Sequence, residues 1–242
     1  MILYGRNAVA EALRAGRRRT HEVFATDKVA KESWLREGRG PVPKVHTVAP
    51  ARLDEMAGTE THQGVCARVD PYHYAGSAEM LAQPDPLILV LDEVQDPQNL
   101  GAICRSAECA GVTGVVIPER RAAEVTPAVC KASAGAVEWL PLARVRNLSD
   151  FLAEAKQAGC WTYGAAAGKG SVDYRTPDWT GGVVLVMGAE GKGLRPRVAQ
   201  SCDALVQLPL NGHIESLNVS AAAAALLYGI LQARTSVLDR AS

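Results

Sequence analysis

A run of polar residues stands directly ahead of an alanine-rich apolar segment near the C-terminus, in the stretch PLNGHIESLNVSAAAAALLYG. Ser216 and Asn218 are two residues apart on the turn that enters this predicted helix, so both side chains can point into one pocket. Capping the first turn of a helix needs one polar side chain, or two at most. The additional polar groups therefore indicate a site for binding or catalysis at the start of the helix.

A second polar loop occurs in LDEVQDPQNLGAICRSAECAG, where an apolar strand leads into a predicted helix. Asn99 can cap this helix, or it can belong to a site. Arg105 follows six residues later, on a helix whose other side is apolar. Its guanidinium is either solvated or belongs to a functional site. The acidic and amide residues of the loop have no recognisable metal-ligand spacing.

A third loop, LVMGAEGKGL, places three glycines around Glu190 directly after an apolar strand. Glycine lets a backbone approach a ligand closely. A Walker A phosphate loop would need glycine and Ser or Thr where this chain has Val186 and Gly193. No G-x-G-x-x-G follows an early strand, so neither a nucleoside-triphosphate enzyme nor a dinucleotide enzyme is indicated.

Strands and helices alternate from Leu87 onward, and LILVLD has the continuous apolar character of a parallel strand covered on both faces. Further strands are predicted in VTGVVIP, after Pro141, and in WTYGAAA, GVVLVMG and ALVQLPL. Helices are predicted in NLGAICRSAECAG, around residues 127–136, over residues 149–158 and in the alanine-rich segment. This pattern predicts an open parallel α/β sheet, in which ligands bind at the carboxyl ends of the strands.

The N-terminal part predicts a smaller α/β unit. YGRNAVAEALRAG has helical spacing of apolar residues and ends at Gly16, whereas HEVFAT, PKVHTV and HQGVCARV predict short strands, with a helical segment around residues 31–36 between the first two. Residues 1–74 carry 12 Lys and Arg against 9 Asp and Glu, although the whole chain has a formal net charge of zero. A cluster of early arginines is either a solvated helix end or a phosphate-binding patch; it comprises Arg14, Arg17, Arg18 and Arg19.

The composition excludes several classes of protein. The longest apolar run, residues 221–231, is too short to span a bilayer. Aromatic residues make up only 5% of the chain, which argues against a stacking platform for single-stranded nucleic acid. The six cysteines include no C-x-x-C pair and no secretory segment precedes them, so reduced thiols and a cytoplasmic location are expected.

Taken in chain order, NLGAICRSAECAGV, LVMGAEGKGL and LPLNGHIESLNVSAAAAALLYG resemble the three motifs of the SpoU branch of the SPOUT RNA 2′-O-ribose methyltransferases, and the resemblance runs from about Pro86 to the C-terminus. YGRNAVAEAL and THQGVCARV are similar to the small ribosomal-protein-like substrate-binding domain of that family. The pairing resembles the subgroup that methylates a guanosine ribose in 23S ribosomal RNA. The turn-forming residues Pro71, Gly76, Pro84 and Pro86 predict a linker at 71–86, which leaves an RNA substrate-binding domain at residues 1–70 and a catalytic domain at 87–242.

The resemblance implies that S-adenosylmethionine is bound within a deep trefoil knot of the C-terminal parallel-sheet domain, which sequence physics alone would not predict because knots are rare. Gly188, Leu208 and Leu217 would hold this cofactor, largely through backbone groups, and a Cβ at Gly188 would crowd its adenosine. Glu190 would organise the glycine loop. No metal is expected, because the sulfonium already activates the methyl group.

Arg105 matches the family arginine proposed to activate the ribose hydroxyl. A guanidinium is always charged and has no acceptor, so it cannot be the base as it stands. Anchoring a phosphate and stabilising a developing 2′-oxyanion is the more conservative role. Asn99 would position Arg105 or the ribose, and Ser216 and Asn218 would orient the hydroxyl and the loop.

The resemblance also implies partners. The alanine-rich helix would pack in a homodimer, and Arg6 together with the Arg14–Arg19 cluster would contact RNA phosphates. The 2′-hydroxyl would distinguish RNA from DNA, and neither DNA nor a membrane is expected as a partner. The third motif reads NGHIES where many relatives have small residues, so His213 and Glu215 either alter substrate contacts or are solvated.

Two alternatives remain open. A transfer-RNA ribose methyltransferase uses the same three motifs, although its usual terminal extensions differ from this compact N-terminal domain. A catalytically silent RNA-binding protein could share the scaffold, although such a protein would not need every polar residue of the three loops. These residues are Asn99, Arg105, Glu190, Ser216 and Asn218.

Overall fold

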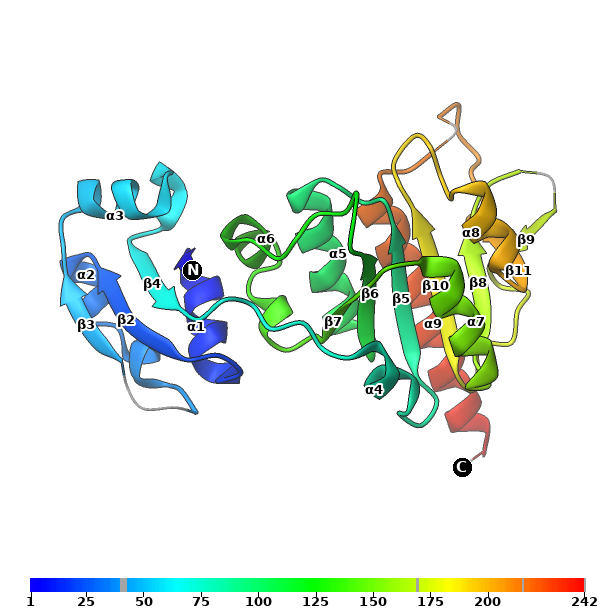
Figure 1. The fold of residues 1–242 in the computed structure, drawn as a ribbon, viewed down its shortest axis with the longest axis horizontal. Helices are drawn as coiled ribbons and strands as arrows, with labels where there is room; N and C mark the ends of the chain where they lie inside the picture. The colour runs from blue at the N-terminus through cyan, green and yellow to red at the C-terminus, as the bar shows by residue number, and fades with distance from the viewer. Residues whose placement is uncertain (40–42, 169, 215, 242) are drawn as a thin grey trace. The chain divides into compact units, whose positions relative to one another are not determined.

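The computed structural model describes residues 1–39, 43–168, 170–214 and 216–241, with side chains up to residue 236 in the last helix (Figure 1). The chain divides into two compact units. The first unit comprises Met1–His73 and Glu124–Trp139, and the second comprises Tyr74–Ala123 and Leu140–Ser242. This division differs from the boundaries expected from sequence, because a segment from within the predicted catalytic domain packs with the N-terminal unit.

The first unit is built on a four-stranded sheet in the order β1-β4-β2-β3. β4 pairs antiparallel with β1 and β2, and β3 pairs parallel with β2. Its strands are β1 (Ile2–Tyr4), β2 (Thr20–Ala25), β3 (Lys44–Thr47) and β4 (Val65–Val69). The last three confirm the predicted strands, whereas β1 was not predicted because three residues are too few to show an alternating pattern.

The helices of the N-terminal segment are α1 (Arg6–Ala15), α2 (Asp27–Ala30), η1 (Ser33–Arg36), α3 (Pro50–Ala57) and η2 (Glu60–His62). α1 ends where the sequence predicts, because Gly16 adopts the left-handed conformation with φ of 63° and its N–H bonds to the Ala12 carbonyl. The helical segment expected around residues 31–36 is the short 3₁₀ turn η1. α3 was not predicted; Pro50 occupies its first position, where the missing N–H is harmless.

The segment Glu124–Trp139 carries α6 (Pro127–Ala132) and η3 (Ala136–Glu138) and is held to the rest of the first unit by polar contacts. Trp139 Nε1 donates to Glu11 Oε2 at 2.9 Å, and Lys131 Nζ donates to the Thr61 carbonyl at 2.6 Å. A Cβ at Gly135 would overlap the Glu11 side chain, and its φ of 87° also favours glycine. This segment is therefore a structural part of the first unit.

The second unit contains a seven-stranded, fully parallel sheet in the order β7-β6-β5-β10-β8-β11-β9. The strands are β5 (Leu87–Asp92), β6 (Gly114–Pro118), β7 (Leu142–Val145), β8 (Trp161–Ala165), β9 (Ser171–Asp173), β10 (Val183–Gly188) and β11 (Ala204–Gln207). Every residue of β5, β6 and β10 is buried, as the continuous apolar runs predict. The parallel α/β sheet predicted from sequence is confirmed, with β9 as an unpredicted edge strand.

Helices cover both faces of this sheet (Figure 1). Phe151 of α7 and Val198 of α8 pack with Ile88, Val90 and Val186 on one face. On the other face, α5 and α9 pack against each other and α9 contacts β10. The helices are α4 (Ser77–Leu81), α5 (Pro97–Cys109), α7 (Leu148–Gln157), α8 (Pro196–Ser201) and α9 (Val219–Ala241). α4 lies in the expected linker.

Among the described residues, no helix is both long and apolar enough to cross a membrane. The same residues contain no group of three or more His, Cys, Asp or Glu side chains placed to hold a metal ion. All six cysteines are free. Burial raises the pKa of Cys66 and of Cys130 to about 11, so both thiols stay protonated near neutral pH.

Candidate active site

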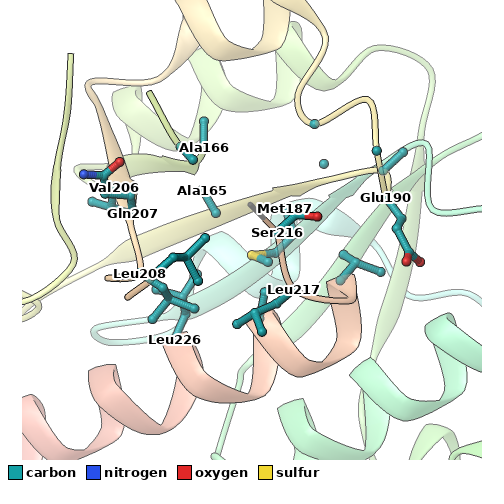
Figure 2. A pocket seen from close by; sticks show the side chains of 18 residues that line it. Ala165, Ala166, Met187, Glu190, Val206, Gln207, Leu208, Ser216, Leu217 and Leu226 are labelled. Atoms are coloured by element: carbon teal, nitrogen blue, oxygen red, sulfur yellow. The ribbon is translucent and has the colours of Figure 1, made fainter. Parts of the chain in front are cut away.

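A cavity of about 370 Å³ lies in the second unit, at the carboxyl ends of β8, β10 and β11. Its walls are the segment after β8, the glycine loop after β10, the loop between β11 and α9, and the first turns of α9. Figure 2 shows Gln207 and Leu208 on one side and Glu190 on the opposite side. The lining residues are Ala165, Ala166, Ala167, Met187, Gly188, Ala189, Glu190, Gly191, Gly193, Val206, Gln207, Leu208, Leu210, Ser216, Leu217, Val219, Ala222 and Leu226.

The charge of this lining restricts the ligand. Among the described residues that line the cavity, none is Lys, Arg or His, and Glu190 is the one ionisable side chain. Alanine and leucine side chains supply apolar walls. Such a cavity suits a largely apolar ligand with a positive charge and offers no side-chain cation to a phosphate.

Gly188, at the end of β10, is required by the fold itself. A Cβ at this position would overlap the backbone of Gly193 and Leu194, where the glycine loop folds back over the strand. The loop is closed by a hydrogen bond of 2.8 Å from the Gly193 N–H to the Ala189 carbonyl. The clash within the protein is therefore a further reason for glycine at this position, and the crowding of a bound adenosine by a Cβ stays a prediction.

Three of the predicted site residues form one hydrogen-bonded cluster. Asn218 Nδ2 donates to Asn99 Oδ1 at 3.0 Å and lies 3.2 Å from Glu190 Oε2. Asn99 Nδ2 reaches the same Glu190 oxygen at 3.5 Å. The three come from α5, the loop after β10 and the start of α9. The cluster joins all three sequence motifs at one end of the sheet.

Asn218 and Asn99 differ in their relation to their helices. Asn218 caps α9, because its Oδ1 accepts from the Ser220 N–H at 2.9 Å. Asn99 does not cap α5, so that interpretation is wrong. Asp96 is the cap, with its carboxylate accepting from the N–H groups of Gln98 and Asn99 at 3.1 Å each. The Asn99 amide is thereby left for contacts outside the helix.

A second cavity of about 250 Å³ lies on the other side of Glu190. It shares Ala189, Glu190 and Val219 with the first cavity, and the Asn99–Glu190 contact forms part of its wall. The remaining lining comes from the loop between β5 and α5 and from Lys192. The cluster therefore separates two adjacent cavities.

An ion pair that the sequence analysis did not identify supports this region. Asp92 is fully buried at the end of β5, and its carboxylate accepts from both the N–H and the Nε of Arg195, at 2.9 and 2.7 Å. The pair ties the loop after β10 to the neighbouring strand. An aspartate that ends an apolar strand was the available signal, but its partner, 103 residues away, was not evident from the sequence.

The other predicted residues are placed differently. Ser216, Leu217 and Leu208 line the first cavity, and Glu215 lies outside the described residues. Arg105 is exposed on α5 and lines neither cavity. Six residues correspond to about 240° around a helix, so Arg105 faces a different side of α5 from Asn99.

The predicted RNA-binding arginines of the first unit fall into three groups. Arg17 and Arg19 are exposed. Arg6 pairs with Glu32, and Arg14 pairs with Glu11 and Glu37, although both arginine side chains remain more than 40% exposed. These four side chains stay at the surface.

Arg18 contradicts the expectation for the cluster. Its side chain is buried and forms a bidentate pair with Glu138, with an Nε–Oε2 distance of 3.0 Å. Burial alone would lower the pKa of Arg18, but the Glu138 carboxylate raises it, so the guanidinium stays charged. A guanidinium held in this way is not available to a phosphate, and Arg18 is removed from the RNA-binding set.

Comparison with known proteins gives the family. Residues 86–228, which carry all three loops, match the SpoU rRNA methylase family. The chain belongs to this family. Residues 2–75 match the RNA 2′-O-ribose methyltransferase substrate-binding domain, so both units have counterparts in one class of RNA methyltransferase. The protein is an RNA 2′-O-ribose methyltransferase of the SpoU family, and S-adenosylmethionine is the methyl donor of that family.

Individual relatives span nearly the whole chain. YacO of Bacillus subtilis, assigned to the TrmH family of tRNA/rRNA methyltransferases, is 38% identical over 96% of each chain. The SpoU methyltransferase AviRb of Streptomyces viridochromogenes, solved with AdoMet, is 26% identical with a TM-score of 0.81, covering 98% of this chain and 91% of its own. An AdoMet-bound rRNA methyltransferase of Sinorhizobium meliloti is 27% identical with a TM-score of 0.78, covering 96% and 86%.

Proposed function

We propose that this protein methylates the 2′-hydroxyl of a guanosine ribose in 23S ribosomal RNA, with S-adenosylmethionine bound in the first cavity. The observation that carries the proposal is the Asn99–Glu190–Asn218 cluster, which brings the three family motifs together beside that cavity. A silent scaffold would not need this convergence of polar groups.

The cavity fits the cofactor. Its volume of about 370 Å³ lies in the range of small-molecule sites, roughly 300–1,000 Å³. The alanine and leucine walls suit an adenine ring, and the lack of a cationic side chain among the described lining residues suits a sulfonium. When bound, S-adenosylmethionine supplies a methyl group that the sulfonium has already activated. Gly188, Leu208 and Leu217 hold it, chiefly through backbone groups.

Glu190, Asn99 and Asn218 act on the acceptor side of the cavity. The second cavity, which borders Glu190 and Asn99, accommodates the reacting nucleotide, and the cluster orients its ribose. Ser216, which lines the first cavity, directs the hydroxyl toward the cofactor. Holding reacting groups in alignment accounts for much of the acceleration in such a reaction.

Arg105 binds the RNA phosphate next to the reacting ribose and stabilises negative charge on the 2′-oxygen. Its exposure leaves the guanidinium accessible to a large substrate. Lys192 is the one cationic side chain among the described lining residues of the two cavities, and neither cavity has an arginine there, so Arg105 would reach the phosphate from beside them.

Ribosomal RNA is favoured over transfer RNA because the chain carries the substrate-binding unit throughout residues 2–75 and resembles an rRNA methyltransferase over 96% of its length. We further propose a cytoplasmic homodimer that takes part in ribosomal RNA processing, with the functional domains at residues 1–70 and 87–242 and a trefoil knot in the C-terminal loops. Tyr228 on α9, which is about half exposed, is an apolar side chain available to a second copy.

The test is methyl transfer from labelled S-adenosylmethionine to unmodified 23S ribosomal RNA and to bulk transfer RNA in parallel. The expected product is a 2′-O-methylguanosine in the ribosomal RNA, mapped by nuclease digestion and mass spectrometry. Label in transfer RNA alone would support the methyl-transfer reaction but contradict the proposal that 23S ribosomal RNA is the substrate. No label in either RNA, with the cofactor bound, would favour the silent scaffold.

A further inference from the structure

The first unit contains a cavity of about 320 Å³ that the proposed reaction does not use. It lies between the C-terminal end of α1, the segment that leads into β2, and η1. Its buried wall is apolar and includes Leu13 and Leu35. Its exposed wall carries Arg17, Arg19 and Arg36. Arg36 comes from the separate turn η1 and lies outside the arginine cluster that the sequence predicts.

The charge in this cavity is not balanced locally. Among the described residues that line it, none is Asp or Glu. Arg18 also lines it, but its guanidinium is committed to Glu138. In the described part of the chain, the guanidinium groups of Arg17, Arg19 and Arg36 form no ion pair. The charge of Arg19 acts on Asp70, whose Oδ1 lies 2.7 Å from His21 Nε2. This hydrogen bond to His21 lowers the pKa of Asp70 more than the charge of Arg19 does.

We propose that this cavity binds one unstacked nucleotide of the RNA substrate. The base packs against the Leu13 and Leu35 wall, and the flanking phosphates pair with the three arginines. Single-stranded segments of RNA expose both a base face and phosphates to a protein, and guanidinium groups pair readily with phosphate oxygens. A small inorganic anion would make no contact with the apolar wall. A purely apolar ligand would leave the three arginine charges without a counter-charge. The choice of RNA as ligand rests on the proposed function.

The geometry separates this site from a general basic surface. A surface field acts through charge alone and involves no contact with buried side chains. A nucleotide in the cavity brings its base to Leu13 and Leu35, which are only 7% and 2% exposed. Contact between RNA and these two side chains is therefore the distinguishing observation.

The experiment uses the full-length protein and a 23S ribosomal RNA transcript containing scattered 4-thiouridine. After irradiation, mass spectrometry should identify crosslinks in the peptides that contain Leu13 or Leu35. In parallel, the triple variant R17Q/R19Q/R36Q is compared with a control triple, K28Q/K31Q/R52Q, which removes the same charge from exposed positions of the same unit. Urea unfolding reports that the first unit of each variant is folded.

The cavity triple should weaken RNA binding by 10-fold or more and reduce the slope of log Kd against log salt concentration by about 2, since each single-strand phosphate contact contributes about 0.7. The control should change affinity less than 3-fold. Equal affinities of the two triples, or crosslinks confined to other peptides, would overturn the cavity site. Failure to methylate the transcript while the Leu13 or Leu35 crosslink persists would instead overturn the proposed substrate.

Discussion

The two units each hold a cavity of similar size, but the linings are electrostatic opposites. The cavity of the second unit, about 370 Å³, has Glu190 as its one ionisable group among the described lining residues. The cavity of the first unit, about 320 Å³, is lined by four arginines and, in the described residues, by no acid. Apolar walls are common to both. The two cavities therefore cannot be assigned ligands from their volumes or their apolar walls. The charge of the lining distinguishes them: an acidic lining favours a cationic cofactor, and a basic lining favours a polyanion.

The largest expected effect concerns Arg105, the exposed arginine that lines neither cavity of the second unit. Arg105→Ala should lower kcat by roughly 10²–10³, the cost of removing one group that stabilises a developing oxyanion, with S-adenosylmethionine affinity unchanged. Single-turnover methylation and calorimetry would measure the two quantities. Arg146→Ala, which removes another exposed arginine of the same unit, is the control. Undiminished turnover in the Arg105 variant would remove Arg105 from the site.

The second prediction tests the wall of the cofactor cavity. Gly188→Ala should weaken S-adenosylmethionine binding about 100-fold, because overpacking by about 3 kcal/mol must displace the loop that folds over β10. Gly212→Ala is the matched control, since a Cβ there meets nothing within 4 Å. Calorimetric titration would distinguish them. RNA binding by the first unit should be unaffected, and equal cofactor affinity in both variants would contradict this account of the loop.

The third prediction concerns the buried arginine beside the RNA-binding cavity. Glu138→Gln leaves the Arg18 guanidinium buried without a full counter-charge and should cost about 3 kcal/mol of the free energy of unfolding. The same substitution at the exposed Glu37, a partner of Arg14, should cost less than about 0.5 kcal/mol. Urea unfolding would measure both.

The double variant R18M/E138L is the companion test, because replacing both charges with apolar groups should recover much of that loss. Equal stabilities of the two single variants would show that the buried pair contributes no more than a surface pair.

The smallest effect separates two roles of Asn218. Asn218→Ala should lower kcat/KM about 10-fold by breaking the cluster, a loss comparable to about 1.4 kcal/mol, and should reduce stability by about 1 kcal/mol through loss of the α9 cap. Asn218→Ser restores a capping oxygen without the amide, so stability should recover while activity stays low. If thermal unfolding and kinetics recover together, capping is the whole role of Asn218.

The sequence by itself determined the local features of this protein. Continuous apolar runs determined which strands are buried on both faces, as in β5 and β10. Gly16 determined the end of α1, because only the left-handed conformation of a glycine closes that helix without strain. The order of the three polar loops determined the family, since those loops carry the chemistry that the family shares.

Only the tertiary structure decided which side chains meet. Asn99 and Asn218, 119 residues apart, come together because α9 packs against α5. Glu190 joins them because β10 is the neighbour of β5 in the sheet, an order that strand patterns do not specify. Likewise, Arg18 is buried while Arg17 and Arg19 are exposed, because the segment Glu124–Trp139 brings Glu138 to it. Local sequence patterns reflect whether each residue prefers solvent or the interior and which backbone conformation it favours. The ion-pair partner of a charged side chain depends instead on which distant segment the fold places beside it.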